Sequence, residues 1–354
     1  MSFEATQKLS PDTELPRHYR ADDSLATFVA ALPKTETHLH LEGSMSFAQL
    51  HALDPERYPQ PPEFWQADFR YRDFDHFQAI CDEWVLPYHN SIERYQETAR
   101  FVFERCKAQG CRYVESSFHL PVVGLIDGDG QDLIAAILDS VPQGLDVRLF
   151  GGMTHTDYGA NAALLEAALG WEQLAGIDLH GPEYWPVDAQ LPDYWRRARE
   201  RGKLTKAHAG EFMPAEFVGW VVDKLAVARV QHGVRAIESP AVIEQLLAAD
   251  VALDVCPISN LKLGVEGIAS MRDHPIKRLM DAGVNVTVST DDTFMFGNQL
   301  VEEYYALVQE LGFSRAELIQ LARNGFNNAL LDEPRRAAYL QELDRFEDVL
   351  ETTA

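Results

Sequence analysis

The sequence is poor in cysteine and in basic residues, and both shortages restrict the class of protein. Four cysteines occur among 354 residues (Cys81, Cys106, Cys111 and Cys256), and none forms a CxxC pair. We therefore expect reduced thiols and a cytoplasmic protein. Lysine and arginine number 31 against 55 aspartates and glutamates, a formal net charge of −24. Such a charge repels polyanions, so we expect no nucleic-acid partner and no anionic membrane.

Long hydrophobic runs are also missing. No stretch approaches the roughly 18–20 apolar residues of a membrane span. Residues 1–23 are polar and interrupted by Pro11 and Pro16, so we expect no signal peptide. The composition is nevertheless 46% hydrophobic, which is ample for a large core.

Short β-rich runs alternate with amphipathic patterns such as DLIAAILDSV and SPAVIEQLLAA. Eight strands separated by helices predict an α/β fold, a parallel (β/α)8 TIM-type barrel. An open doubly wound sheet would be expected to carry a Gly-rich phosphate loop after its first strand, and the sequence has none there. The predicted strands are Thr35–His40, Arg112–Phe118, Val147–Thr154, Leu174–His180, Leu204–Ala209, Arg229–Gly233, Ala252–Val255 and Asn285–Ser289.

The stretch from Ser44 to Gln109 is too long for an ordinary crossover and is rich in aromatic residues. We predict a helical insertion that covers one mouth of the barrel. Phe74 and Phe77, three residues apart, would share a helix face and either close over the substrate or pack the insertion itself. Residues 315–354 predict C-terminal packing helices. We expect a polar N-terminal extension over residues 1–24 and a single barrel domain over residues 25–354.

Polar residues that are able to do chemistry recur at the C-terminal ends of the predicted strands, where barrel enzymes carry their reactive groups. The first strand ends in THLHLEG, and its i, i+2 spacing puts both imidazoles on one face. Each feature alone is a weak signal, since a DD pair is often a helix N-cap. Their shared position is hard to obtain by chance. The residues are His38, His40, His208, Glu211, His232, Asp291 and Asp292.

Three imidazoles and a carboxylate form a plausible zinc set, with neutral nitrogen ligands, one anionic oxygen and room for a water. The remaining groups at these strand ends would then serve in acid–base chemistry or orient the substrate. The pattern therefore predicts a site for metal-assisted hydrolysis.

Six long segments, in order, resemble the adenosine/adenine deaminase family of the amidohydrolase superfamily. The resemblance covers roughly residues 32–328. It implies a barrel with one zinc ion per chain, which removes the 6-amino group of a small aminopurine by hydrolysis and releases ammonia. The segments are LPKTETHLHLEGSM, KAHAGE, RVQHGVRAIE, LDVCPISNLKLGV, HPIKRLMDAGVNVTVSTDDTFMFG and EEYYAL.

The resemblance also implies a role for each matched residue. The zinc ligands would be His38, His40, His208 and Asp291. Glu211 would protonate purine N1, which makes C6 electrophilic and requires a raised pKa. His232 would accept the water proton, and Asp291 would share in catalysis as a ligand. The substrate would contact His40, Glu42, the Gly181 N–H at N3, Asp292 at N7, and Phe74 and Phe77.

The sequence leaves the tail of the substrate open. Glu42 stands where nucleoside-preferring members often carry Asp, and His180 and Pro182 flank Gly181 in place of the expected Ala and Asp. We favour an adenosine-like nucleoside, because DLHGPE keeps the glycine. Free adenine and adenosines modified at the 5′ position or at N6 are the alternatives. The carboxylate of Glu42 would repel a 5′-phosphate.

Two other classes of protein compete with a deaminase. A different metal-dependent hydrolase could use the same barrel, but binuclear members usually carry a carboxylated lysine after the fourth strand. DLHGPE has none there, and Lys206 belongs to the fifth strand. A non-catalytic relative would be expected to have lost matched residues, and all of them are present. The oligomeric state leaves no signal in the sequence.

Overall fold

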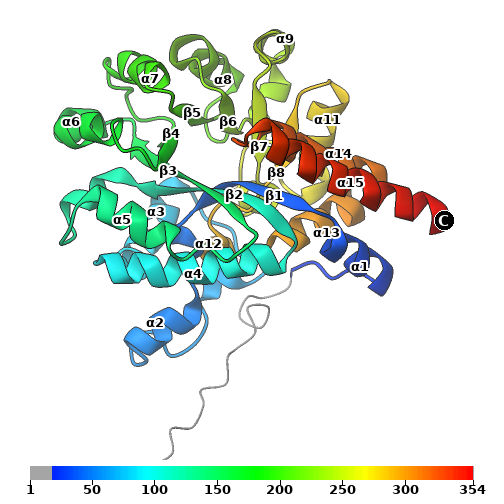
Figure 1. Ribbon diagram of the computed structural model, residues 1–354, viewed down its shortest axis with the longest axis horizontal. Coiled ribbons are helices and arrows are strands. Elements are labelled where there is room, and N and C mark those ends of the chain that lie inside the picture. The colour runs from blue at the N-terminus through cyan, green and yellow to red at the C-terminus, as the bar shows by residue number, and fades with distance from the viewer. Residues whose placement is uncertain (1–17, 354) are drawn as a thin grey trace, which may run out of the picture.

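The computed structural model describes residues 18–353 and forms a barrel of eight parallel strands in chain order (Figure 1). Each strand matches its predicted counterpart to within one residue at either end, so the predicted TIM-type barrel is confirmed. The strands are β1 (Lys34–His40), β2 (Cys111–His119), β3 (Asp146–Thr154), β4 (Leu174–His180), β5 (Leu204–Ala209), β6 (Arg229–His232), β7 (Ala252–Val255) and β8 (Val286–Val288).

The seam between the first and last strands is closed by the residues that the sequence analysis singled out. The Asp291 N–H donates to the His38 carbonyl at 3.0 Å, and the His40 N–H donates to the Asp291 carbonyl at 3.1 Å. These bonds form a parallel bridge between Leu39 and Asp291. Closure of the barrel therefore places the HxH motif of β1 directly beside the two aspartates that follow β8.

Helices surround the barrel, as Figure 1 shows. Several begin at a side-chain N-cap, such as Ser91 before α4 and Asp129 before α5. Among residues 18–353, no helix is both long and apolar enough to cross a membrane. The α-helices between β2 and residue 315 are α5 (Gly130–Leu138), α6 (Asp157–Ala168), α7 (Leu191–Glu200), α8 (Ala215–Trp220), α9 (Pro240–Ala249), α10 (Pro257–Lys262), α11 (Ile276–Asp281), α12 (Thr293–Phe296) and α13 (Leu300–Leu311).

The predicted insertion contains two different parts. Its last helix, α4 (Ile92–Ala108), packs on β2 and α5 and is an ordinary crossover helix. The part before α4 carries α2 (Phe47–Leu53) and α3 (Phe74–Trp84). This part is fixed to the connection after β8, where the Tyr71 hydroxyl donates to the Met295 carbonyl at 2.8 Å. It therefore lies at one mouth of the barrel, as predicted, and the structure identifies this mouth as the C-terminal one.

The two ends of the described chain also pack against the barrel. Helix α14 (Arg315–Asn328) lies on β1 and β8, and α15 (Glu333–Thr353) lies on α14. A Cβ at Gly325 would come within 1.9 Å of Thr35 Oγ1, so the glycine permits the close approach of α14. Helix α1 (Asp23–Ala31) packs against α13, as Figure 1 shows. Of the predicted N-terminal extension, residues 1–17 lie outside the described residues.

A network of buried ion pairs fills the barrel one layer below the strand ends. Lys206 and Arg229 both pair with the Glu115 carboxylate, and Arg229 Nε lies 3.5 Å from Asp254 Oδ2. Lys206 lies two residues before His208, and Glu115 lies two residues before Ser117, whose hydroxyl contacts His40, so both point into the same interior. The Lys206 ammonium also donates to the Thr37 carbonyl at 2.7 Å. Lys206 is therefore committed to this lower layer.

Candidate metal centre and active site

The four predicted metal ligands converge at the C-terminal mouth of the barrel. His208 Nε2 lies 3.1 Å from both His38 Nε2 and His40 Nε2. Asp291 Oδ1 lies 3.3 Å from each of the two β1 imidazoles. His38, His208 and Asp291 are buried, with at most 5% of each residue exposed. The structure thus brings together side chains from β1, β5 and the end of β8.

The hydrogen bonds at Nδ1 leave the Nε2 lone pairs facing one another. His38 Nδ1 donates to the Asp254 carbonyl at 3.0 Å, and His208 Nδ1 donates to the Leu179 carbonyl at 2.9 Å. Each neutral ring has a single N–H, so its Nε2 is a bare lone pair. Two lone pairs at 3.1 Å repel unless a cation lies between them. A divalent metal with nitrogen and carboxylate ligands therefore fits this arrangement.

The possible ligand atoms form three compact groups, and any two of these groups have one residue in common. One contains His38, His208, His232 and Asp291; a second contains His40, Asp178 and His208; a third contains His40, Asp291 and Asp292. His38 and His40 share no group, and their ring centres are 5.5 Å apart. His232, predicted as a base, thus lies at ligand distance from the predicted set.

The charge states at the centre favour a cation. Burial lowers the pKa of His40 to about 3, so its imidazole is neutral. Burial alone would raise the pKa of Asp291, but His38 and His232 hold it well below its usual range. Burial would lower the pKa of His208, but Asp178 and Asp291 raise it above its ordinary value. The neutral His40 nitrogen and the anionic Asp291 oxygen are in the forms that metals bind.

Glu211 lies beside this centre in the loop after β5. Its Oε1 is 3.5 Å from His232 Nε2 and accepts a hydrogen bond from Asn260 Nδ2 at 3.3 Å. Burial, reinforced by Asp291 and Glu183, raises the pKa of Glu211 well above its ordinary value. The geometry therefore favours the protonated form of this carboxyl, which is the form that the predicted N1 donor requires.

Two of the reactive residues have backbone conformations that are uncommon outside glycine. His232 has a φ of +62° and Asp291 a φ of +70°. The left-handed region costs about 1–3 kcal/mol for such residues and persists where the surrounding structure enforces it. Here the bonds that close the barrel and the chain turn at Gly233 enforce it. The strain directs both side chains toward the centre.

Asp292 packs against the turn that contains Glu42 and Gly43. A Cβ at Gly43 would come within 1.7 Å of Asp292 Oδ1, so the glycine of HLEG makes room for Asp292. Burial, followed by Asp291, raises the pKa of Asp292 well above its ordinary value. Glu42 Oε1 accepts hydrogen bonds from the Tyr95 hydroxyl and the His119 N–H, both at 2.9 Å. Glu42 is thus tied to the wall of the mouth.

The predicted aromatic pair bridges two of the loops that form the site. Phe77 stacks on Phe296 with ring centres 5.6 Å apart, and Phe74 meets Phe212 edge-on at 5.5 Å. Phe212 directly follows Glu211, and Phe296 lies in α12, just after Asp292. Helix α3 therefore spans the mouth from the β5 loop to the β8 loop.

Sequence reasoning missed the residues that orient the reactive groups. Ser259 Oγ donates to Asp291 Oδ2 at 2.7 Å, and Asn260 Nδ2 lies 3.0 Å from His232 Nδ1. Both belong to the CPISN segment after β7, which the sequence indicated only as part of a family motif. Asp178 Oδ1 lies 3.3 Å from His208 Nδ1. Its position two residues before His180, on the same face of β4, was the signal available in the sequence.

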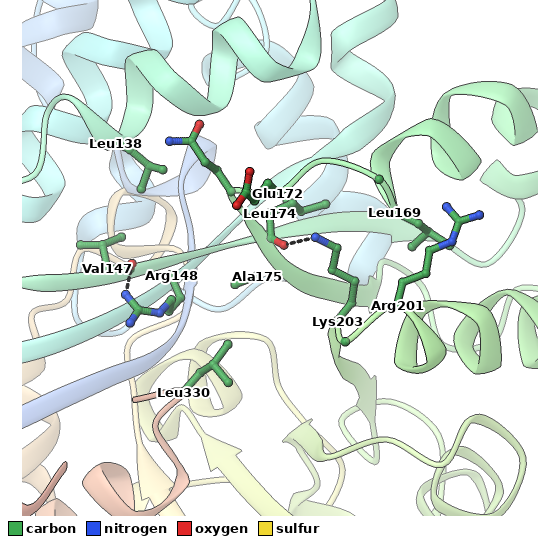
Figure 2. A pocket seen from close by; sticks show the side chains of 13 residues that line it. Leu138, Val147, Arg148, Leu169, Glu172, Leu174, Ala175, Arg201, Lys203 and Leu330 are labelled. Carbon is green, nitrogen blue, oxygen red and sulfur yellow. Dashed lines mark hydrogen bonds between the residues drawn. The ribbon is translucent and has the colours of Figure 1, made fainter. Parts of the chain in front are cut away.

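A cavity at the opposite end of the barrel has no comparable chemistry. It measures about 650 Å³ and lies at the N-terminal ends of β3, β4 and β5 (Figure 2). Lys203 Nζ donates to the Trp171 and Leu174 carbonyls at 2.5 and 2.6 Å, so backbone groups already bind its charge. This end of a TIM barrel serves stability.

A parallel barrel with a His/Asp cluster at its C-terminal mouth defines the class of metal-dependent amidohydrolases. The profile of the family described as adenosine deaminase matches residues 33–346, so the chain belongs to this family of hydrolytic deaminases. It is 30% identical to an adenine deaminase of Sphingopyxis alaskensis, over 94% of this chain and 100% of that protein.

Solved structures agree with this assignment. The crystal structure of an adenine deaminase from Arthrobacter aurescens superposes with a TM-score of 0.79 at 26% identity, covering 90% of this chain and 100% of that one. An amidohydrolase from Burkholderia ambifaria with bound Zn has the same fold. Its TM-score is 0.78 at 23% identity, covering 96% of this chain and 98% of that one.

Proposed function

We propose that this protein is a zinc-dependent aminopurine deaminase that acts on the free base adenine. The observation that carries the proposal is the set of facing Nε2 lone pairs beside Asp291, with a buried protonated Glu211 next to it. His38, His40, His208 and Asp291 would hold the metal. One zinc per chain fits nitrogen ligands with a single carboxylate.

Each remaining group has a task that follows from its position. When bound, zinc lowers the pKa of a water molecule to roughly 7, which makes a nucleophile available at neutral pH. Glu211 donates its proton to purine N1, which draws electron density from C6. His232, 3.5 Å from Glu211 Oε1, accepts the proton that the water gives up. Asp292 carries a raised pKa and would donate to N7. The water oxygen bonds to C6, the amino group takes the proton held by His232, and ammonia leaves as the C6–N bond breaks, while the hydroxyl proton on C6 returns to Glu211.

Two observations favour the free base over the nucleoside preferred from sequence alone. The Sphingopyxis alaskensis and Arthrobacter aurescens relatives are both named adenine deaminases. In addition, Glu42 Oε1 already accepts hydrogen bonds from Tyr95 and His119, so only Oε2 of this carboxylate is left to accept bonds from sugar hydroxyls. Adenosine therefore becomes the reference substrate rather than the preferred one.

The proposal also covers location and domain limits. We propose a cytoplasmic protein with one catalytic domain over residues 25–354 and no nucleic-acid or membrane partner. Four free cysteines in the described chain and a net charge of −24 support this.

The test is ammonia release from adenine, adenosine, 2′-deoxyadenosine and AMP, run side by side with metal analysis. We expect one zinc per chain and the highest kcat/KM for adenine. Chelation should abolish turnover, and added zinc should restore it. A higher kcat/KM for adenosine or AMP would contradict the substrate, and full activity without metal would contradict the zinc chemistry.

A further inference from the structure

Two histidines outside the metal centre form a hydrogen-bonded pair in the wall of the mouth. His119 ends β2 and His180 ends β4, and His119 Nδ1 lies 3.0 Å from His180 Nε2. Their rings are stacked with centres 5.2 Å apart. The His180 ring centre is 5.5 Å from that of His40. The pair therefore runs from the metal centre outward to His119, whose side chain is 37% exposed.

The strand between them is shaped to admit the pair. β3 lies between β2 and β4, and its Gly152 pairs in register with His119. A Cβ at Gly152 would come within 2.7 Å of His180 Cε1, so any other residue would displace the His180 ring. A glycine at this position has a specific steric purpose. The pair is thus built into three neighbouring strands.

A carboxylate on the outer side fixes the order of protons along the pair. His119 Nε2 lies 3.9 Å from Asp157 Oδ2, which also accepts a bond from the Thr154 N–H at 2.6 Å. An N–H at His119 Nε2 is favoured there over a lone pair facing the carboxylate. The neutral His119 ring then has a bare Nδ1, which accepts from the Nε2–H of His180. His180 Nδ1 is left as a bare acceptor.

The residue after His180 in the chain supplies a backbone donor. Gly181 directly follows His180, and its φ of +84° turns the chain at the end of β4. Within residues 18–353, His180 Nδ1 has no hydrogen-bond partner of its own. An acceptor, His180 Nδ1, and a backbone donor, the N–H of Gly181, therefore belong to consecutive residues at the end of β4.

We infer that His180, positioned by His119 and Asp157, is a specificity-determining residue that accepts a hydrogen bond from the N9–H of the purine. The inference rests on the proposed function. Free adenine carries a donor at N9 beside an acceptor at N3, on the side of the ring away from C6. The acceptor at His180 and the donor at Gly181 complement this pair. A substituent at N9 removes the donor and adds bulk against the His180 ring.

The experiment compares adenine with 9-methyladenine, which differs only at N9. A site that is built to bind an N–H rejects the analogue that lacks it, so wild type should prefer adenine by at least about 100-fold in kcat/KM. In His180→Ala, kcat/KM for adenine should fall, while kcat/KM for 9-methyladenine should stay constant or rise. The ratio of the two kcat/KM values should therefore decrease by at least about tenfold. His119→Asn and Asp157→Asn change the groups that position His180 and leave His180 itself in place, so they should lower the ratio of adenine to 9-methyladenine kcat/KM in the same direction.

Controls separate this role from a structural one. His51→Ala, an exposed histidine in α2, should leave the ratio at the wild-type value. All variants should keep one zinc per chain. If His180→Ala lowers kcat/KM for adenine and for 9-methyladenine by the same factor, the inference is wrong. If His180→Ala does not fold, a stable His119→Asn variant provides the same test. If wild type deaminates neither adenine nor adenosine, the proposed function itself fails; if it deaminates adenine with an unchanged ratio in the variants, only the role of His180 fails.

Discussion

The two polar layers inside the barrel differ in whether their charges are balanced. In the lower layer, two cations, Lys206 and Arg229, face two anions, Glu115 and Asp254. In the upper layer, the ion pairs within the described part of the chain all join a histidine to a carboxylate. The lower layer is complete without a ligand, whereas the upper layer lacks a cation.

This difference separates a structural cluster from a functional one that is equally buried. Balanced buried pairs hold the interior together, although each charge loses its hydration. A group of imidazoles and carboxylates without lysine or arginine must bind protons or a metal instead. Lys206 belongs to the lower layer and not to the candidate metal centre. The binuclear alternative considered from sequence therefore gains no ligand from Lys206, whose ammonium pairs with Glu115.

The largest expected effect is on the upper layer. His208→Ala removes the nitrogen that lies 3.1 Å from both β1 imidazoles, so metal and activity should be lost together. Metal analysis with ammonia release measures both. His232→Asn sharpens the result: zinc should remain while activity falls, if His232 acts as the base. Full zinc content in His208→Ala would contradict the ligand set.

Glu211→Gln tests the acid in the same layer. The amide keeps the shape but cannot give up a proton to N1, so kcat should fall by about 10²–10⁴ with zinc retained. Because the pKa of Glu211 is raised, wild-type kcat should hold at neutral pH and fall as rising pH removes the proton. The exposed Glu216→Gln in α8 serves as the control and should keep wild-type kcat. Near-normal turnover in Glu211→Gln would exclude the role.

Substitutions in the lower layer should lower the free energy of unfolding rather than change catalysis. Glu115→Gln leaves Lys206 and Arg229 without their shared carboxylate, which should cost about 3–5 kcal/mol of unfolding free energy. Urea unfolding measures it, with zinc content unchanged in the folded protein. Glu200→Gln breaks an exposed pair with Arg196 and should cost about 0–1 kcal/mol. Equal costs for the two variants would remove the distinction between the layers.

The smallest effect is expected above the upper layer, in α3. Phe77→Ala removes the ring stacked on Phe296, so KM for the purine should rise a few-fold, with a loss of about 0.5–3 kcal/mol in stability. Phe217→Ala is a matched control, because Phe217 stacks on Trp220 at the same 5.6 Å. An unchanged KM with lowered stability in both variants would assign Phe77 to packing alone.

Several features of the fold and the site follow from the sequence alone. The eight strands could be placed because β-rich runs and amphipathic helices alternate with a regular period. The HxH motif could be assigned to one face because side chains alternate along a strand. The segments around His208, His232 and Asp291 were sufficient to indicate the family, since long motifs recur in order.

Only the tertiary structure decided which side chains meet across strands. The bond between His119 and His180, the engagement of Glu42 by Tyr95, and the placement of Asn260 against His232 all join residues far apart in the chain. Such contacts depend on barrel register and on which neighbour lacks a side chain, as Gly152 and Gly43 do here. The local sequence pattern indicates neither the register of the barrel nor these close approaches. The sequence therefore determined the barrel and indicated the deaminase family, while packing between strand ends shaped the wall of the mouth.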